Sequence, residues 1–157
     1  MSKFQGKIAL ITGSGTGIGK AIATKFVEQG ASVIILGRRK EPLEDAAKGL
    51  QKIISQNSSG ATVRIFSGVD VADETAMNGM FDSLKNDNVN VDYVINNAGV
   101  SGPVTCFANA PLDEFKSTIG IHLTGTFWGS VQALKVMKAG GKIITISTFF
   151  TEERPLE

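Results

Sequence analysis

The 157-residue sequence predicts an α/β domain built on a doubly wound parallel sheet. Two observations support this prediction: short apolar runs alternate with segments of helical periodicity, and those runs lack the polar–apolar alternation of half-exposed strands. We expect about five strands, with helices on both faces and right-handed crossovers between strands. Ligands of such sheets bind beyond the carboxyl ends of the strands, so residues that follow a strand are the first candidates for a site.

The first half of the chain predicts three strands and two helices. The strands are expected at residues 7–12, 32–36 and 62–66. Apolar residues at every fourth position from Ile18 to Phe26 indicate a helix over residues 17–29, which Gly30 would end. A second helix begins near Pro42, because proline suits a first helical turn.

The second half predicts a third helix with Asp73 as its N-cap, then a strand over residues 91–95 and a long helix. The apolar residues of the long helix recur at every fourth position: Phe115, Ile119, Leu123, Phe127 and Val131. We expect Lys138 in its last turn, Gly140–Gly141 at its end, and a fifth strand over residues 142–147.

Composition narrows the function classes. The chain is 42% hydrophobic and 20% charged, with a net charge of +1, so we expect one globular domain without a nucleic-acid or membrane partner. Cys106 is the single cysteine and permits no intrachain disulfide, which favours the cytoplasm. With one histidine and one cysteine, the usual zinc spacings are excluded and no metal site is expected.

A glycine-rich loop, TGSGTGIGK, occupies residues 12–20 between the first strand and the first helix. G-x-G-x-x-G does not fit, because its third glycine would fall on Ile18 or Lys20, and a P-loop would need glycine at Ser14. T-G-x-x-x-G-x-G fits residues 12–19. Main-chain amides at a helix N-terminus suit a pyrophosphate, although glycine-rich turns also occur without a ligand.

The end of the second strand carries the signal for cofactor choice. An NAD site would have a carboxylate there to bind the ribose hydroxyls. The sequence has Gly37-Arg38-Arg39 instead, and no carboxylate before Glu41. A guanidinium at this place can pair with a 2′-phosphate, so we predict NADP in preference to NAD. The alternative is a solvated pair of arginines on the surface.

The sequence NNAG at residues 96–99 follows the fourth strand, and with the glycine loop it identifies a family. The chain resembles short-chain dehydrogenases/reductases along nearly its whole length. This resemblance implies a Rossmann-like dinucleotide-binding domain over residues 1–157, truncated relative to the family. Asp70-Val71 resembles the family's D-V pair, which contacts the adenine. Together with the glycine loop and the two arginines, the resemblance predicts cofactor contacts at Gly13, Ser14, Thr16, Gly17, Ile18, Gly19, Arg38, Arg39, Asp70, Val71, Asn97, Ala98 and Gly99.

Within that set, Ser14, Thr16 and Ile18 would lie against the diphosphate. Asn97 and the two residues after it would lie near the adenosine ribose. A purely structural role is the alternative for Asn96 and Asn97, as a turn that ties strands together. In the family, this structural role and cofactor contact occur together.

The family's catalytic set is a Tyr and a Lys in Y-x-x-x-K, a Ser and an Asn. By alignment, Thr148 holds the catalytic hydroxyl with Ser147 before it, and His122 stands at the Asn position. His122 could anchor a relay water or be an ordinary packed helix residue. Tyr93 is the only tyrosine and lies within a strand, so the Tyr–Lys pair would fall beyond Glu157. We therefore expect a part of a longer protein that is inactive by itself.

The resemblance implies an NADP-dependent oxidoreductase that moves a hydride between a carbonyl and an alcohol of a small molecule. Three alternatives stay open: an enoyl- or dienoyl-CoA reductase, a non-catalytic NADP(H)-binding module, or a structural fold with no ligand. A homo-oligomer could form through the long helix. Without further strands the fifth strand would be an exposed sheet edge. Close packing is expected at Gly120, Gly125 and Gly129, since glycine weakens a helix.

Overall fold

The computed structural model describes residues 2–147, and its sheet has the predicted class. Five parallel strands lie in the order β3-β2-β1-β4-β5. The strands are β1 (Ile8–Thr12), β2 (Ser32–Gly37), β3 (Val63–Ser67), β4 (Val91–Asn96) and β5 (Met137–Thr145). The helices are α1 (Gly17–Glu28), α2 (Lys40–Asn57), α3 (Glu74–Asn86), α4 (Leu112–Ile119) and α5 (Thr126–Ala133), with the π-helix η2 (Gly120–Gly125) between the last two and a short 3₁₀ turn, η1 (Phe107–Asn109).

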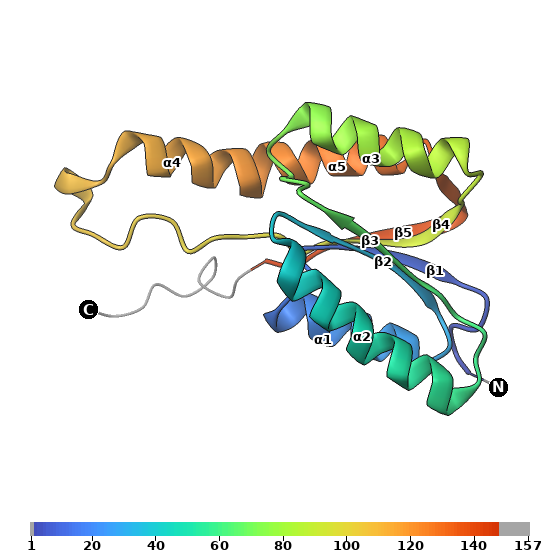
Figure 1. Ribbon diagram of the computed structural model, residues 1–157. Coiled ribbons are helices and arrows are strands. Elements are labelled where there is room, and N and C mark those ends of the chain that lie inside the picture. Colours follow the sequence, from blue (N-terminus) through green and yellow to red (C-terminus); the bar gives the residue numbers. More distant parts are fainter. Residues whose placement is uncertain (1, 148–157) are drawn as a thin grey trace.

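Helices cover both faces of the sheet, as expected for a doubly wound fold (Figure 1). Helices α1 and α2 lie on one face, where β1 and β2 contribute Ala9, Ile11 and Ile35 to the core. Helices α3 and α5 lie on the other face, where Leu10 and Leu36 of the same strands are fully buried. Burial on both faces explains why these strands read as continuous apolar runs.

The predicted end of the long helix is wrong. Helix α5 ends at Ala133, and Lys138 and Gly140–Gly141 lie inside β5. The amide of Val91 donates to the carbonyl of Val136, and Val91 pairs with Met137, so β4 recruits the chain before the glycines are reached. The register then shifts between Val91 and Tyr93, which places the glycines in an irregular part of the strand.

Two of the three glycines of the long helix meet close neighbours, as predicted, whereas Gly120 makes only an ordinary contact, with Ala72 Cβ at 3.5 Å. A Cβ on Gly125 would lie 2.9 Å from Val71 Cγ2, and one on Gly129 would lie 3.3 Å from Met77 Cε. Trp128 donates to Asn78 Oδ1 over 3.1 Å. The helix therefore packs against α3 and the segment before it, inside this chain.

Another face of the same helix and the sheet edge expose apolar side chains. Phe115, Leu123 and Phe127 are each more than half exposed, at 53%, 65% and 64%. β5 is an edge of the sheet, as predicted, and Ile144 in it is 41% exposed. Exposed apolar surface of this extent favours association with other surfaces.

Candidate functional site

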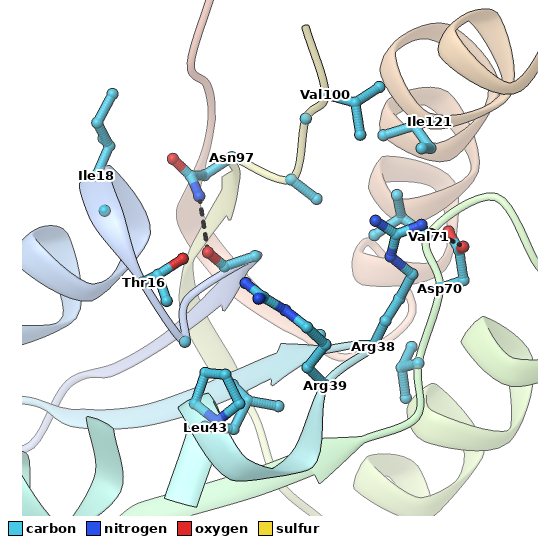
Figure 2. Close-up of a pocket in the computed structure, with 18 residues that line it drawn as sticks. Thr16, Ile18, Arg38, Arg39, Leu43, Asp70, Val71, Asn97, Val100 and Ile121 are labelled. Atoms are coloured by element: carbon cyan, nitrogen blue, oxygen red, sulfur yellow. Dashed lines mark hydrogen bonds and ion pairs between the residues drawn. The ribbon is translucent and has the colours of Figure 1, made fainter. Parts of the chain in front are cut away.

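A cavity of about 470 Å³ opens at the carboxyl ends of β1, β2, β3 and β4. It lies where the strand order reverses, with β1 between β2 and β4. That reversal is the place where open α/β sheets bind their ligands. Figure 2 shows the side chains around it. The lining residues are Gly13, Gly15, Thr16, Gly17, Ile18, Gly37, Arg38, Arg39, Pro42, Leu43, Val69, Asp70, Val71, Asn97, Ala98, Gly99, Val100 and Ile121.

The glycine loop packs directly on the NNAG segment. Thr12 Oγ1 accepts from the amides of Asn97 and Ala98 over 2.9 and 2.8 Å. The side-chain amide of Asn97 donates to the carbonyl of Thr12 over 2.9 Å. Gly13 has φ +65° there, and a Cβ on Gly19 would lie 2.5 Å from Asn97 Nδ2. Only glycine at these two positions lets the segments approach so closely.

The two asparagines of NNAG make structural hydrogen bonds, and one of them also lines the cavity. Asn96 donates to Ser130 Oγ over 3.0 Å and so ties β4 to α5. Asn97 ties β4 to the glycine loop and also lines the cavity. A structural role for the pair is therefore present, and Asn97 remains accessible to a ligand.

The N-terminus of α1 faces the cavity without a side-chain cap. Thr16 is the N-cap residue, but its side chain makes no capping hydrogen bond, and the first turn holds no acidic residue. The first amides of a helix have no partner within it, and they carry the positive end of its dipole. The residues of this turn, Gly17 and Ile18, line the cavity, so an anion in the cavity could accept from its amides.

Two arginines enter the cavity from the end of β2 in different directions. Figure 2 shows the Arg38 guanidinium beside Asp70, whereas Arg39 extends toward Thr16. Arg38 Nη1 lies 3.6 Å from Asp70 Oδ2. Among residues 2–147, no ion pair involves Arg39. The cavity is thus basic on its β2 side, with one arginine facing a carboxylate and one facing the glycine loop.

Two residues predicted to contact a cofactor lie beneath the cavity wall. Ser14 is fully buried, its hydroxyl donates to the carbonyl of Ile11 over 2.8 Å, and it accepts from the amide of Leu36 over 3.0 Å. Gly19 is buried under Asn97. These contacts make both residues part of the loop's support. The other eleven predicted residues line the cavity.

His122 lies in the π-helical segment and holds the end of the NNAG loop. Its Nε2 is 3.1 Å from the amide nitrogen of Val100 and 2.8 Å from the carbonyl oxygen of Val100. The imidazole also packs on Gly99, where a Cβ would lie 2.7 Å from Cε1. His122 does not line the cavity, but it fixes two residues that do.

Of the two predicted hydroxyl residues, Ser147 follows β5. Ser147 is exposed and does not line the cavity. Thr148 lies outside the described residues. Residues 2–147 contain no group of three or more His, Cys, Asp or Glu side chains that could hold a metal. None of the helices described is both long enough and apolar enough to cross a membrane.

Sequence reasoning missed the apolar part of the cavity wall. Pro42 and Leu43 line it from the first turn of α2, Val69 follows β3, and Ile121 comes from the π-helix. These residues carry no motif. Their position after strands could have suggested Val69, but nothing in the local sequence pointed to Ile121.

A comparison with protein-family models matches residues 7–155 to the family described as short chain dehydrogenase. An NADP-dependent (R)-specific alcohol dehydrogenase of Lentilactobacillus kefiri is 34% identical over 93% of this chain and 56% of its own length. A 3-oxoacyl-[acyl-carrier-protein] reductase of Aquifex aeolicus is 31% identical over 93% of this chain and 57% of its own. The chain thus spans just over half the length of these curated relatives.

Solved structures show the same relation. An NAD⁺-bound xylitol dehydrogenase superposes with a TM-score of 0.86 at 30% identity, over 98% of this chain and 57% of that protein. A short chain dehydrogenase from Burkholderia cenocepacia in complex with NADP gives a TM-score of 0.86 at 25% identity, over 98% of this chain and 60% of that protein. The sheet described above is therefore truncated relative to these neighbours.

Proposed function

The chain belongs to the short chain dehydrogenase family, and from that premise we propose that it is the cofactor-binding part of an NADP-dependent oxidoreductase. The reaction we propose transfers a hydride between a carbonyl and an alcohol of a small molecule. The observation that carries the proposal is the cavity at the β1–β4 reversal, where the uncapped start of α1, two arginines and the NNAG segment converge.

The residues present fit a dinucleotide. The cavity volume of about 470 Å³ is in the range of small-molecule sites. A Cβ on Gly15 would lie 3.2 Å from Pro42 Cβ, so the glycine loop packs closely against the start of α2. The amides at the start of α1 would take the diphosphate, and the Asp70–Val71 wall would take the adenine.

Arginine chemistry supports NADP over NAD. Arg38 and Arg39 stand where an NAD site would carry a carboxylate, and both line the cavity. A guanidinium forms charge-assisted bonds to a phosphate dianion but gains little from a ribose hydroxyl. The Lentilactobacillus relative is named as NADP-dependent, whereas one structural neighbour holds NAD⁺. The relatives therefore do not agree on one cofactor, and the preference we propose rests on the two arginines of this chain.

Bound nicotinamide would supply the hydride chemistry. Within this chain, His122 holds Val100 and Gly99, so we assign it the role of positioning the cavity wall. We propose Thr148 and Ser147 as hydroxyls that face the substrate in the whole protein. Tyr93 packs against Phe4 and Phe26, with its ring centroid 5.4 Å from each of theirs, and is not a lining residue of the cavity. We therefore expect the 157 residues to bind dinucleotide without turnover.

Isothermal titration of the 157-residue chain with NADPH and with NADH tests this proposal. We expect saturable binding of both and tighter binding of NADPH. The double variant Arg38→Ala/Arg39→Ala should lose about tenfold or more of NADPH affinity and little NADH affinity. Lys48→Ala, an exposed lysine of α2 outside the cavity, is the matched charge control and should change neither. Equal loss for both dinucleotides would contradict the 2′-phosphate assignment.

Two further parts of the proposal concern the protein's setting. Cys106 is exposed and unpaired by any disulfide among the described residues, which supports a cytoplasmic location. The exposed Phe115, Leu123 and Phe127 support a homo-oligomer formed through the long helix. Light scattering of Phe127→Glu beside the unaltered chain tests the latter: the variant should be the smaller species, and identical masses would contradict it.

A further inference from the structure

The carboxylate of Asp70 lies beside Arg38, one of the two arginines that we expect to select NADP over NAD. Arg38 Nη1 and Asp70 Oδ2 are 3.6 Å apart, and their side chains are 60% and 34% exposed. Both residues line the cavity. The other oxygen of Asp70, Oδ1, accepts from the amide of Ala72 over 3.0 Å. Asp70 is therefore fixed by its own turn and faces Arg38 with its second oxygen.

A 2′-phosphate and the Asp70 carboxylate are both anions that a single guanidinium can bind. An exposed pair of this length is weak, so a phosphate dianion can displace it. While Asp70 is ionised, however, it neutralises part of the positive potential of Arg38, so this guanidinium binds the incoming phosphate less strongly. Arg39, which extends toward Thr16, has no such carboxylate in the described part of the chain.

We propose that Asp70 competes with the 2′-phosphate for Arg38 and thereby limits the preference of the chain for NADP over NAD. This inference rests on the proposed function, because it concerns the same cavity. It concerns selectivity and not adenine contact. Any bond between Asp70 and the adenine would be made equally by NADPH and NADH, so it cancels in the ratio of the two affinities.

A holding role for Asp70 predicts the opposite result. If the carboxylate kept Arg38 in place for the phosphate, removing its charge would release the guanidinium and lower the preference for NADP. The two roles therefore differ in the sign of one measured ratio, and this sign does not depend on whether overall affinity rises or falls.

The variant Asp70→Asn removes the charge and keeps a side-chain oxygen for the amide of Ala72. The measurement is the ratio of the dissociation constants of NADH and NADPH by titration calorimetry at fixed salt, repeated with 5′-ADP and 2′,5′-ADP, which carry only the adenosine half. We expect the ratio to rise about threefold in favour of the 2′-phosphorylated ligand, the scale of one exposed ion pair. An unchanged or lower ratio would overturn the proposal.

Three controls locate the effect. Glu44→Gln breaks a pair with the same 3.6 Å separation, to Lys40, outside the cavity, and should leave the ratio unchanged. In an Arg38→Ala background the rise should disappear, whereas in an Arg39→Ala background it should persist. A rise that survives Arg38→Ala would assign it to direct repulsion and overturn competition for Arg38. Failure of the unaltered chain to bind any dinucleotide would instead refute the proposed function, and this inference with it.

Discussion

Helices α1 and α3 solve the same physical problem in two ways. In α3 the Asp73 carboxylate accepts from the amides of Thr75 and Ala76 over 2.9 and 3.1 Å. In α1 the N-cap Thr16 makes no such bond, and its first turn has no acidic side chain. Both helices follow a strand of the same parallel sheet, and the first amides of both lack partners within the helix.

We interpret the difference as that between a helix start that serves only the fold and one that is free to bind a ligand. At α3 the chain supplies its own anion, so the amides are satisfied in the absence of any ligand. At α1 the amides adjoin a cavity that Arg38 and Arg39 also line, and the first turn of the helix has no acidic residue. We interpret the missing cap as the room that a diphosphate would take.

The largest effect is expected from Gly19→Ala in α1. The new Cβ would lie 2.5 Å from Asn97 Nδ2 and 2.6 Å from the carbonyl oxygen of Gly13, and backbone cannot move aside cheaply. We expect the free energy of unfolding to fall by about 3 kcal/mol and dinucleotide binding to be lost. Urea denaturation and calorimetry measure the two quantities.

The matched control is Gly79→Ala in α3, where a Cβ would meet nothing within 4 Å. Alanine should stabilise that helix by roughly 0.5–1 kcal/mol and leave binding unchanged. If both substitutions had the same effect, the close contact between the glycine loop and the NNAG segment would not be what requires glycine.

Thr16→Asp gives α1 the cap that α3 already has. A carboxylate there would bind the first amides and repel a diphosphate, so NADPH affinity should fall roughly thirtyfold. Thermal stability should hold or rise slightly, because an acidic N-cap stabilises a helix. Calorimetry of Thr16→Asp and Thr16→Ser tests this. Equal affinity in both variants would place the diphosphate elsewhere.

Asp92 lies near the amino-terminal end of β4, away from the carboxyl ends of the strands where the cavity opens, and tests whether a charge paired inside the chain has a purely structural role. Its side chain is only 6% exposed, Oδ1 lies 3.1 Å from Lys7 Nζ, Oδ2 lies 3.5 Å from Lys138 Nζ, and Oδ2 accepts from the amide of Ile8 over 2.9 Å. We expect Asp92→Asn to lower the free energy of unfolding by about 1.5 kcal/mol at neutral pH, with dinucleotide affinity unchanged. A loss of affinity would contradict the separation of this charge cluster from the cavity.

The same variant predicts a pH dependence. Burial raises the pKa of Asp92, but the Ile8 amide and the two lysines outweigh it and hold the pKa below its ordinary value. A carboxylate with a lowered pKa stabilises the fold above the unfolded pKa of about 3.9 and loses that contribution as the pH falls through the folded pKa. The difference between the unaltered chain and Asp92→Asn should therefore be constant near neutrality and shrink below about pH 4.

The smallest effect is expected from Asp73→Ala, which removes the cap of α3. The free energy of unfolding should fall by about 1 kcal/mol. NADPH affinity should be unaltered, because Asp73 is not a lining residue of the cavity. Comparison with Thr16→Ala, which removes no capping bond, completes the test. If Thr16→Ala cost as much stability as Asp73→Ala, the two helix starts would not differ in the way described.

Local signals in the sequence predicted most of this architecture. The Asp73 cap and the glycine loop depend on neighbours within a few residues, and both were predicted correctly. The end of the long helix was not, because the amide of Val91 bonds to the carbonyl of Val136, a partner 45 positions along the chain. Strand pairing at that separation leaves no local trace that distinguishes a helix end from a strand start.

The sequence likewise pointed to some of the residues that line the cavity and not to others. Residues in motifs, such as Thr16 and Asn97, line the cavity, and their contact with a cofactor stays a prediction. Ser14 and Gly19 belong to the same motif but lie beneath the surface, since a motif fixes sequence and not which side of the loop faces the ligand. Ile121 was missed because a π-helical turn determines its direction, and the apolar periodicity of the segment suggests an ordinary helix.

The most direct test of the central claim is a crystal structure of the 157-residue chain grown with NADPH. The account predicts the diphosphate within hydrogen-bond distance of the main-chain amides at the start of α1, with the 2′-phosphate beside Arg38 and Arg39. A ligand bound elsewhere, or a cleft closed by side chains with no dinucleotide in it, would contradict the account.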